Sequence, residues 1–297
     1  YLLAELPKVS QYHFPPGRKY FNYKYAKSEL YGVSSTSIQL IFERHFSTNR
    51  YINVGFDESE LSVHCVPSIG YDKVFGDFVI STITRLDKTY VEPLIFSVKK
   101  FAEQNPNQRV VLLIAGGSKT QGRESYMFTK YPRHMTEIVN LEIIFTGYID
   151  KLGKDLFSMT DVFVGMGTAS INAISQKCLT LNIDPFRNLT SGFFGTDTNN
   201  FAFSEHGKLY PIFAKIDEAY KLSKKDKDII REHGRRLFEK EFEMNVCFSK
   251  LDNAIFSIKP SDASRFFRIP KYYALLVKVY RQLLKKDVVN YDISKIN

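Results

Sequence analysis

The 297-residue chain contains no tryptophan, and its three cysteines, Cys65, Cys178 and Cys247, are far apart in the sequence. Their spacing excludes a cysteine-based metal site and is typical of reduced, buried thiols in a cytoplasmic protein. No apolar run approaches the ~20 residues that a membrane-spanning helix needs. The first residues are too short and too polar for a signal peptide. The chain does not start with methionine, so we expect a fragment or a trimmed chain.

Acidic residues are scarce relative to basic ones near the C-terminus. The net charge is +9, and residues 221–297 carry 18 Lys or Arg against 10 Asp or Glu, which is almost the whole excess. Such asymmetry indicates a basic surface for anionic lipid, nucleic acid or a charged ligand. The alternative is an ordinary solvated helical surface.

The middle of the chain alternates between apolar runs of strand length and segments with helical periodicity, and 44% apolar residues are enough for a real core. This alternation predicts an α/β fold, in which a Rossmann-like parallel sheet has helices on both faces and binds its ligand at the carboxyl ends of the strands. The expected strands are 77–84, 109–115, 141–146, 161–164 and 179–183. The expected helices are 91–104, 123–139 (interrupted near Pro132), 152–159 and 169–177.

The two ends of the chain have different patterns. Residues 1–70 hold short apolar runs and the breaker Pro15-Pro16-Gly17, and we expect only part of an α/β domain there. From about residue 215 onward the pattern is helical, with Ser223 as a candidate cap and a last helix over 271–286. The expected division is therefore a partial N-terminal segment 1–70, a ligand-binding domain 71–255 and a helical extension 256–297.

Polar and glycine residues follow four successive strands. After the first strand, Arg85 and Lys88 are suited to a diphosphate, and the hydroxyls of Ser81, Thr82 and Thr84 can bind its oxygens. The next two strands end in Gly116-Gly117 and in Tyr148-Ile149, where backbone groups can meet a nucleobase. Each feature alone is also typical of an ordinary strand exit, but four at one sheet edge favour a binding site.

The fourth strand leads into Gly165-Met-Gly-Thr168 and then a helix. The two glycines allow close backbone approach, and Thr168 or Ser170 is expected to cap the helix. A helix N-terminus behind a glycine turn offers free N–H groups and the positive end of the helix dipole. This stretch therefore predicts a phosphate-binding turn.

Residues 75–200 resemble the donor-binding half of a GT-B glycosyltransferase, closest to the retaining group with bacterial polysaccharide and lipopolysaccharide enzymes. The resemblance rests on Thr84-Arg85-Leu86-Asp87-Lys88, Gly116-Gly117, Thr146-Gly147-Tyr148-Ile149, Thr160-Asp161-Val162-Phe163-Val164 and Asn172-Ala173-Ile174-Ser175. It implies the GT-B C-terminal fold, with residues 1–70 as the remnant of an N-terminal acceptor-side domain and the last helix returning to it. Whether that first domain is truncated or reduced stays open.

The resemblance also implies site residues and their roles. Arg85 and Lys88 would be catalytic, because they neutralise the leaving diphosphate without a metal or another cofactor. The donor would be a nucleotide-diphosphate sugar. The substrate-binding residues would be Ser81, Thr82, Thr84, Gly116, Gly117, Tyr148, Ile149, Gly165, Gly167, Thr168, Ala169 and Asn172.

Three positions depart from the family pattern. Asn172 stands where the family has the glutamate that holds the donor ribose, and Val164 stands where a second glutamate would fall. Tyr90 occupies the usual position of the family's lysine, and Lys88 is the nearest cation to it.

The acceptor would be a glycan or a lipid-linked sugar. Lys271, Lys278, Arg281 and Lys285 share one face of the last expected helix, which suits peripheral contact with an anionic membrane. A core-facing helix with a solvated basic side is the alternative. The expected location is cytoplasmic, with contact at the inner face of the membrane.

Three other functions remain as alternatives. A non-catalytic relative would keep the nucleotide-diphosphate site as a binding or assembly module. A dehydrogenase is disfavoured because no Gly-x-Gly-x-x-Gly follows the first strand. Nucleic-acid binding lacks a recognition motif, so we expect no nucleic-acid partner.

Overall fold

The computed structural model of the chain describes residues 2–4, 30–32, 51–61, 70–118, 120–134, 137–149, 152–184, 187–199 and 208–256. The chain divides into two compact units, one of residues 1–33, 37–51 and 251–297 and the other of residues 34–36 and 52–250. In the first unit, β1 (Leu2–Ala4) and β2 (Leu30–Gly32) pair in parallel. The expected domain division stays a prediction, and the helix expected over 271–286 lies outside the described residues.

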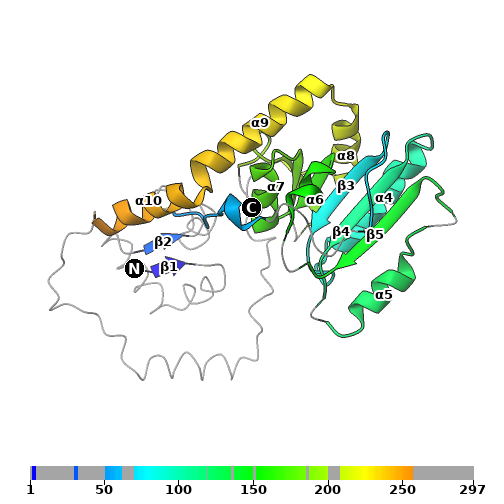
Figure 1. The fold of residues 1–297 in the computed structure, drawn as a ribbon, viewed down its shortest axis with the longest axis horizontal. Coiled ribbons are helices and arrows are strands. Elements are labelled where there is room, and N and C mark those ends of the chain that lie inside the picture. The colour runs from blue at the N-terminus through cyan, green and yellow to red at the C-terminus, as the bar shows by residue number, and fades with distance from the viewer. Residues whose placement is uncertain are drawn as a thin grey trace. The chain divides into compact units, whose positions relative to one another are not determined.

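The second unit is built on a six-stranded sheet in the order β5-β4-β3-β6-β7-β8 (Figure 1). The strands are β3 (Phe78–Ile83), β4 (Val110–Ala115), β5 (Leu141–Gly147), β6 (Val162–Gly165), β7 (Thr180–Asp184) and β8 (Leu189–Phe193). All neighbours pair in parallel except β7 and β8. The chain moves outward from β3 to β5 and then returns to place β6 on the other side of β3. This reversal is the position at which open α/β sheets bind ligands.

Helices cover both faces of the sheet, as the alternation predicts (Figure 1). On one face α4 (Val91–Gln104), α5 (Arg123–Lys130) and α8 (Ile212–Lys221) pack on alternate residues of the strands, such as Ile80 and Leu112. On the other face α6 (Lys154–Ser158) and α7 (Thr168–Ser175) pack on the residues between, such as Val79 and Phe163. Since both faces are buried, β4 and β6 are continuously apolar.

Two further helices follow the sheet. The long helix α9 (Lys224–Glu241) packs on α7 through Phe238 and begins at Ser223, whose side chain accepts the N–H of Asp226 as a cap. Helix α10 (Met244–Phe256) comes directly after it. The predicted helical pattern and the cap at Ser223 are confirmed.

Most of the predicted elements are present, with two differences. Helix α5 ends at Lys130 rather than near 139, because Pro132 lacks an N–H and keeps Tyr131 out of helical conformation (φ −127°, ψ 78°). Strand β8 was not expected, because its sequence Leu-Thr-Ser-Gly-Phe has a glycine in its interior and little apolar character. Its antiparallel pairing with β7 forms it.

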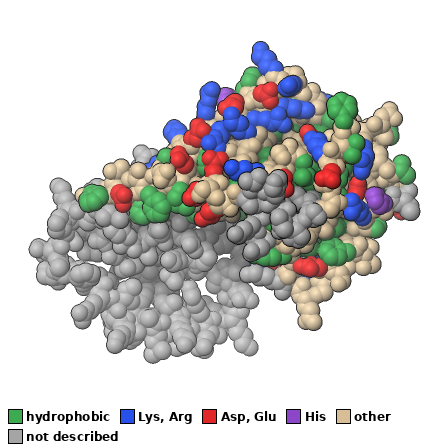
Figure 2. All heavy atoms as spheres, in the orientation of Figure 1, with side chains coloured by type: hydrophobic (Ala, Val, Ile, Leu, Met, Phe, Trp, Pro, Cys, Tyr) green, Lys and Arg blue, Asp and Glu red, His purple; other side chains and the backbone are tan. Residues whose placement is uncertain are grey.

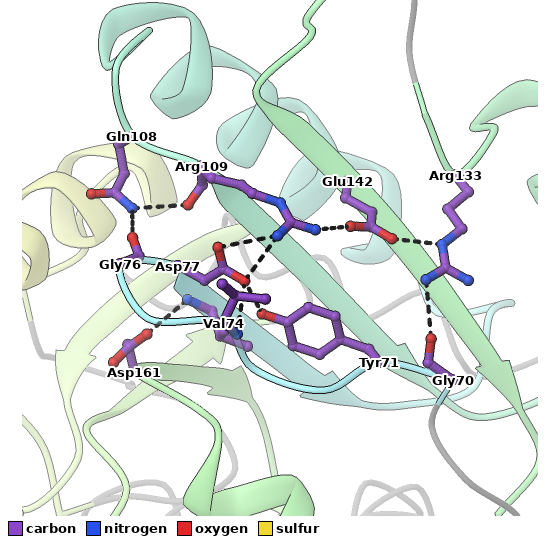
Figure 3. Close-up of polar contacts among 11 residues, drawn as sticks. Gly70, Tyr71, Val74, Gly76, Asp77, Gln108, Arg109, Arg133, Glu142 and Asp161 are labelled. Carbon is purple, nitrogen blue, oxygen red and sulfur yellow. Dashed lines mark hydrogen bonds and ion pairs between the residues drawn. The ribbon is translucent and has the colours of Figure 1, made fainter.

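A network of charged side chains fixes the amino edge of the sheet (Figure 3). Glu142, at the start of β5, is almost fully buried and accepts hydrogen bonds from Arg109 Nη2 at 2.8 Å and from Arg133 Nε at 2.6 Å. Arg109 also contacts the buried carboxylate of Asp77 at 3.4 Å, and the Tyr71 hydroxyl donates to the same carboxylate at 2.5 Å. The starts of β3, β4 and β5 are thus tied together by charges that neutralise one another.

The same network holds the segment that leads into β3. Arg133 Nη2 donates to the carbonyl of Gly70 at 3.0 Å, and Gln108 Nε2 donates to that of Gly76 (Figure 3). Lys73 Nζ pairs with Asp161 at 2.7 Å. These cations are engaged with the protein's own acceptors, so this edge is structural.

The basic excess of the C-terminal quarter is only weakly visible in the described residues. Figure 2 shows Lys and Arg side chains over α9, with Asp and Glu between them. Helix α9 carries seven Lys or Arg and five Asp or Glu. Several of them pair, as in Lys177–Glu232, Arg231–Asp228 and Arg235–Glu239. This surface is therefore a mixed, solvated one, and residues 257–297 contribute most of the excess.

Candidate functional site

A cavity of about 380 Å³ lies at the carboxyl edge of the sheet, where β3 meets β6. Its walls come from the loops that follow β3, β4, β5 and β6, the four positions that the sequence predicts. The predicted site residues in its wall are Thr84, Arg85, Lys88, Gly116, Gly117, Tyr148, Ile149, Gly167, Thr168 and Ala169. Ile83, Tyr90, Ala115, Leu152 and Met166 complete it. Parallel strands bring these loops together because their carboxyl ends share one edge.

The loop after β3 supplies the two predicted cations. It is anchored by fully buried Leu86, whose N–H donates to the carbonyl of Gly117 at 3.0 Å. The Arg85 side chain is 45% exposed, and its Nε lies 3.6 Å from Asp87 Oδ1. Lys88 is half-buried, and its N–H donates to the Arg85 carbonyl at 3.1 Å. This turn presents two positive charges to one cavity, which makes the cavity suited to an anion.

Gly116 is needed where the ends of β3 and β4 come closest. Its φ is +142°, and a Cβ there would lie 2.0 Å from the carbonyl oxygen of Thr84. The Gly116 N–H donates to the Gly147 carbonyl at 2.9 Å, and the Thr84 N–H donates to the Ala115 carbonyl at 2.8 Å. Because Gly116 has no Cβ, the backbones of the loops after β3 and β4 can lie in direct contact there. Any other residue would clash with the Thr84 carbonyl oxygen.

The loop after β6 leads directly into α7. Gly167 has φ +63° and ψ −140°, and its missing Cβ faces open space. Its carbonyl accepts the N–H groups of Ser170 and Ile171 at 3.1 and 3.3 Å, which starts the helix at the cavity wall. The first N–H groups of a helix have no acceptor within it, and the dipole there is positive. The start of α7 thus lies at the cavity wall, and its phosphate-binding role stays a prediction.

The expected side-chain cap of α7 is wrong. Gly167 is the N-cap, and no side chain of the described residues caps the helix. The Ser170 hydroxyl donates instead to Asn182 Oδ1 at 3.1 Å, and Thr168 is the first helical residue. The start of α7 lies at the cavity wall, which Gly167, Thr168 and Ala169 line.

Ser81 and Thr82 do not line the cavity, contrary to expectation. Both lie inside β3 and are fully buried. The Ser81 hydroxyl lies 2.8 Å from that of Thr160, so it is engaged in the core. Thr82 lies on the opposite face, beside the phenol of Tyr90. Only Thr84 lies beyond the strand end, where a hydroxyl can reach a ligand.

Gly165 and Asn172 are also absent from the cavity wall. Gly165 is buried, and a Cβ there would lie 2.6 Å from the ring of Phe163, so this glycine accommodates an aromatic side chain. Asn172 is 9% exposed, and its Oδ1 has no hydrogen-bond partner among the described residues. It lies one turn, about 6 Å, farther along α7 than Thr168. That extra turn places Asn172 behind the helix start.

Tyr90 is a buried tyrosine of the cavity wall that was not among the predicted site residues. It comes directly before α4 and is only 1% exposed, although it lines the cavity. Burial raises the pKa of the Tyr90 phenol, and the neighbouring hydroxyls of Thr84 and Thr82 act in the opposite direction. The only signal in the sequence was its position five residues after Arg85, at the usual place of the lysine in the resembled family.

Two other searches concern the described residues alone. They contain no group of three His, Cys, Asp or Glu side chains arranged to hold a metal ion. No helix in the described ranges is long and apolar enough to cross a membrane.

Solved structures with a similar fold include glycosyltransferases. HepE from Anabaena, in complex with UDP and glucose, matches at a TM-score of 0.51 and 16% identity, over 77% of this chain and 62% of HepE. A variant of TarM from S. aureus, in complex with fondaparinux, α-GlcNAc-glycerol and UDP, matches at a TM-score of 0.51 and 14% identity, over 82% of this chain and 47% of TarM. A glycosyltransferase from Rickettsia africae matches at a TM-score of 0.57 and 14% identity, over 88% of this chain and 69% of that enzyme.

These similarities establish a GT-B glycosyltransferase fold for this chain. The predicted α/β architecture with a Rossmann-like sheet is confirmed. The chain spans 62% of HepE and 47% of TarM. No protein-family model and no curated protein sequence match it.

Proposed function

We propose that this chain binds a nucleotide-diphosphate sugar in the cavity at the carboxyl edge of the sheet and transfers the sugar to a glycan or lipid-linked acceptor. The observation that carries the proposal is that the Arg85–Lys88 turn and the start of α7 line the same cavity. Positive charge and backbone donors there meet the two requirements of a diphosphate. The similar fold of HepE, solved with UDP and glucose, supports the same ligand class.

The proposed donor lies with its diphosphate between Arg85, Lys88 and the first residues of α7. Its base lies toward Tyr148, which is 75% exposed at the cavity wall beside Ile149. As the bond from sugar to diphosphate breaks, negative charge grows on the leaving group, and the two cations stabilise it. The proposed reaction retains the configuration of the sugar, as in the resembled family, and these side chains supply the charge without a metal or another cofactor.

The proposed setting is polysaccharide or lipopolysaccharide assembly in the cytoplasm, with peripheral contact at the inner face of the membrane. The basic helix expected over 271–286 would make that contact, and it belongs to the residues that the structure does not describe. Nucleic acid is not a partner in this proposal.

A second candidate is a binding module that keeps the diphosphate site without turnover. Asn172 favours it, because its side chain is uncharged and lies off the cavity wall. Release of sugar from a labelled nucleotide sugar, measured beside binding, separates the two. Binding without release supports the module.

Calorimetry with UDP and GDP tests the diphosphate site. Arg85→Ala should weaken binding by about 1.5–3 kcal/mol, the range for hydrogen bonds to charged groups. The matched control is Arg236→Ala, which removes an exposed arginine of α9 that does not line the cavity and should leave affinity unchanged. Failure of wild type to bind any nucleotide diphosphate would refute the proposal, and equal affinity of Arg85→Ala would remove Arg85 from the site.

A further inference from the structure

The wall of the cavity contains one buried polar group that the proposed function leaves without a role. Tyr90 is 1% exposed and lines the cavity beside Thr84, Arg85 and Lys88. It occupies the N-cap position of α4 in helical conformation (φ −82°, ψ −8°), and its side chain does not cap the helix. Its place in the wall is therefore not explained by the start of α4.

The protonation of this phenol determines what it can offer a ligand. Burial raises the pKa of Tyr90 above its ordinary value, although the Thr84 and Thr82 hydroxyls counteract the shift. The group therefore keeps its proton throughout the neutral range. It is an O–H donor without charge, next to two charged donors.

A diphosphate accepts more hydrogen bonds than the side chains of Arg85 and Lys88 alone provide in a fixed geometry. Its oxygens accept several hydrogen bonds, and Arg85 already shares its charge with Asp87 at 3.6 Å. Lys88 is a point charge on a flexible stem, so it adds charge without fixed geometry. A phenol held rigidly in the wall adds a directed hydrogen bond and no further charge.

We propose that the Tyr90 hydroxyl donates a hydrogen bond to a diphosphate oxygen of the bound nucleotide. Tyr90 is then a third side chain that contacts the diphosphate, beside Arg85 and Lys88. This inference rests on the proposed function and deepens it. The cavity then recognises diphosphate through two cations, the start of α7 and one neutral donor. The neutral donor contributes affinity that salt does not screen.

The test is Tyr90→Phe, which removes only the hydroxyl. Loss of one hydrogen bond to a charged oxygen should weaken binding of UDP and inorganic pyrophosphate about 10-fold or more in calorimetry. The control is Tyr131→Phe, another buried tyrosine, whose hydroxyl donates to Glu92 at 3.0 Å away from the cavity. Tyr131→Phe should leave both affinities unchanged, and thermal unfolding should show that both variants fold.

Salt dependence separates the hydroxyl from the cations. The Tyr90→Phe loss should be the same at about 50 and 300 mM salt, whereas the Arg85→Ala loss should shrink as salt rises. Equal UDP affinity of Tyr90→Phe and wild type overturns this inference alone, while Arg85→Ala still reports on the proposed function. A loss that occurs with UDP-glucose but not with UDP places the phenol at the sugar and overturns the diphosphate contact. Wild type that binds neither UDP nor GDP overturns both proposals.

Discussion

Gly116→Ala offers the sharpest test of how this fold builds its cavity. The added methyl group would lie 2.0 Å from the Thr84 carbonyl oxygen and 2.8 Å from its carbonyl carbon. Both are backbone atoms, so a rotamer change cannot relieve the contact. The ends of β3 and β4 must separate instead.

The size of the effect follows from what the separation breaks. Holding an alanine at φ +142° costs about 1–3 kcal/mol. Each of the two backbone hydrogen bonds that join these two strand ends, Thr84 to Ala115 and Leu86 to Gly117, contributes about 1 kcal/mol. We therefore expect Gly116→Ala to lower the free energy of unfolding by about 3–5 kcal/mol.

A second glycine provides the matched control. Gly122, which precedes α5, also has positive φ (+74°), but no atom of the described residues lies within 4 Å of its missing Cβ. Gly122→Ala should therefore cost only the conformational part, about 1 kcal/mol. Urea unfolding followed by circular dichroism measures both variants, and calorimetry with UDP measures the cavity.

The comparison of Gly116→Ala with Gly122→Ala can refute the reasoning. Equal losses in the two variants would mean that the two strand ends separate without cost, and the reasoning about the crossing would be refuted. Retained UDP affinity in a folded Gly116→Ala variant would show that the shape of the cavity does not depend on this backbone contact.

Two further predictions concern buried charges. Glu142→Gln removes the charge that Arg109 and Arg133 contact and should lower the free energy of unfolding at pH 7 by about 2 kcal/mol. Burial raises the pKa of the Glu142 carboxyl, but the two guanidinium groups outweigh burial and hold that pKa below 4.5. The difference in the free energy of unfolding between wild type and Glu142→Gln should therefore disappear as the pH falls below 4.5. Urea titrations at several pH values measure it, with the exposed Glu103→Gln as control. Lys215→Met removes a 7%-exposed ammonium that pairs with Asp197 at 2.9 Å, and it should lower the free energy of unfolding by about 2 kcal/mol at neutral pH. An unchanged thermal midpoint for Lys215→Met would contradict the pairing.

Local periodicity explains why so much of the fold was predictable. Helix α4 has the predicted bounds, and the predicted strands of the sheet are present within about two residues, because strands buried on both faces are predominantly apolar. Local chemistry also identified Ser223 as a cap, since its hydroxyl accepts an N–H three residues on.

The site was predictable only as far as the strand ends. Arg85, Gly116 and Gly167 line the cavity because each directly follows a parallel strand. Ser81 and Thr82 do not, because one residue of strand length decides whether a hydroxyl lies in the core or at the ligand. Asn172 was misplaced for a similar reason, since one helical turn removes it from the wall.

The sequence by itself determined the order of strands and helices and the positions of the four loops, because these depend on neighbouring residues. Only the tertiary structure decided that β3 lies in the middle of the sheet with β6 beside it, that β8 joins β7, and that Tyr90 enters the cavity. The physical reason is that these features come from contacts between residues distant in the chain. Such contacts decide which side chain is covered and which one faces a ligand.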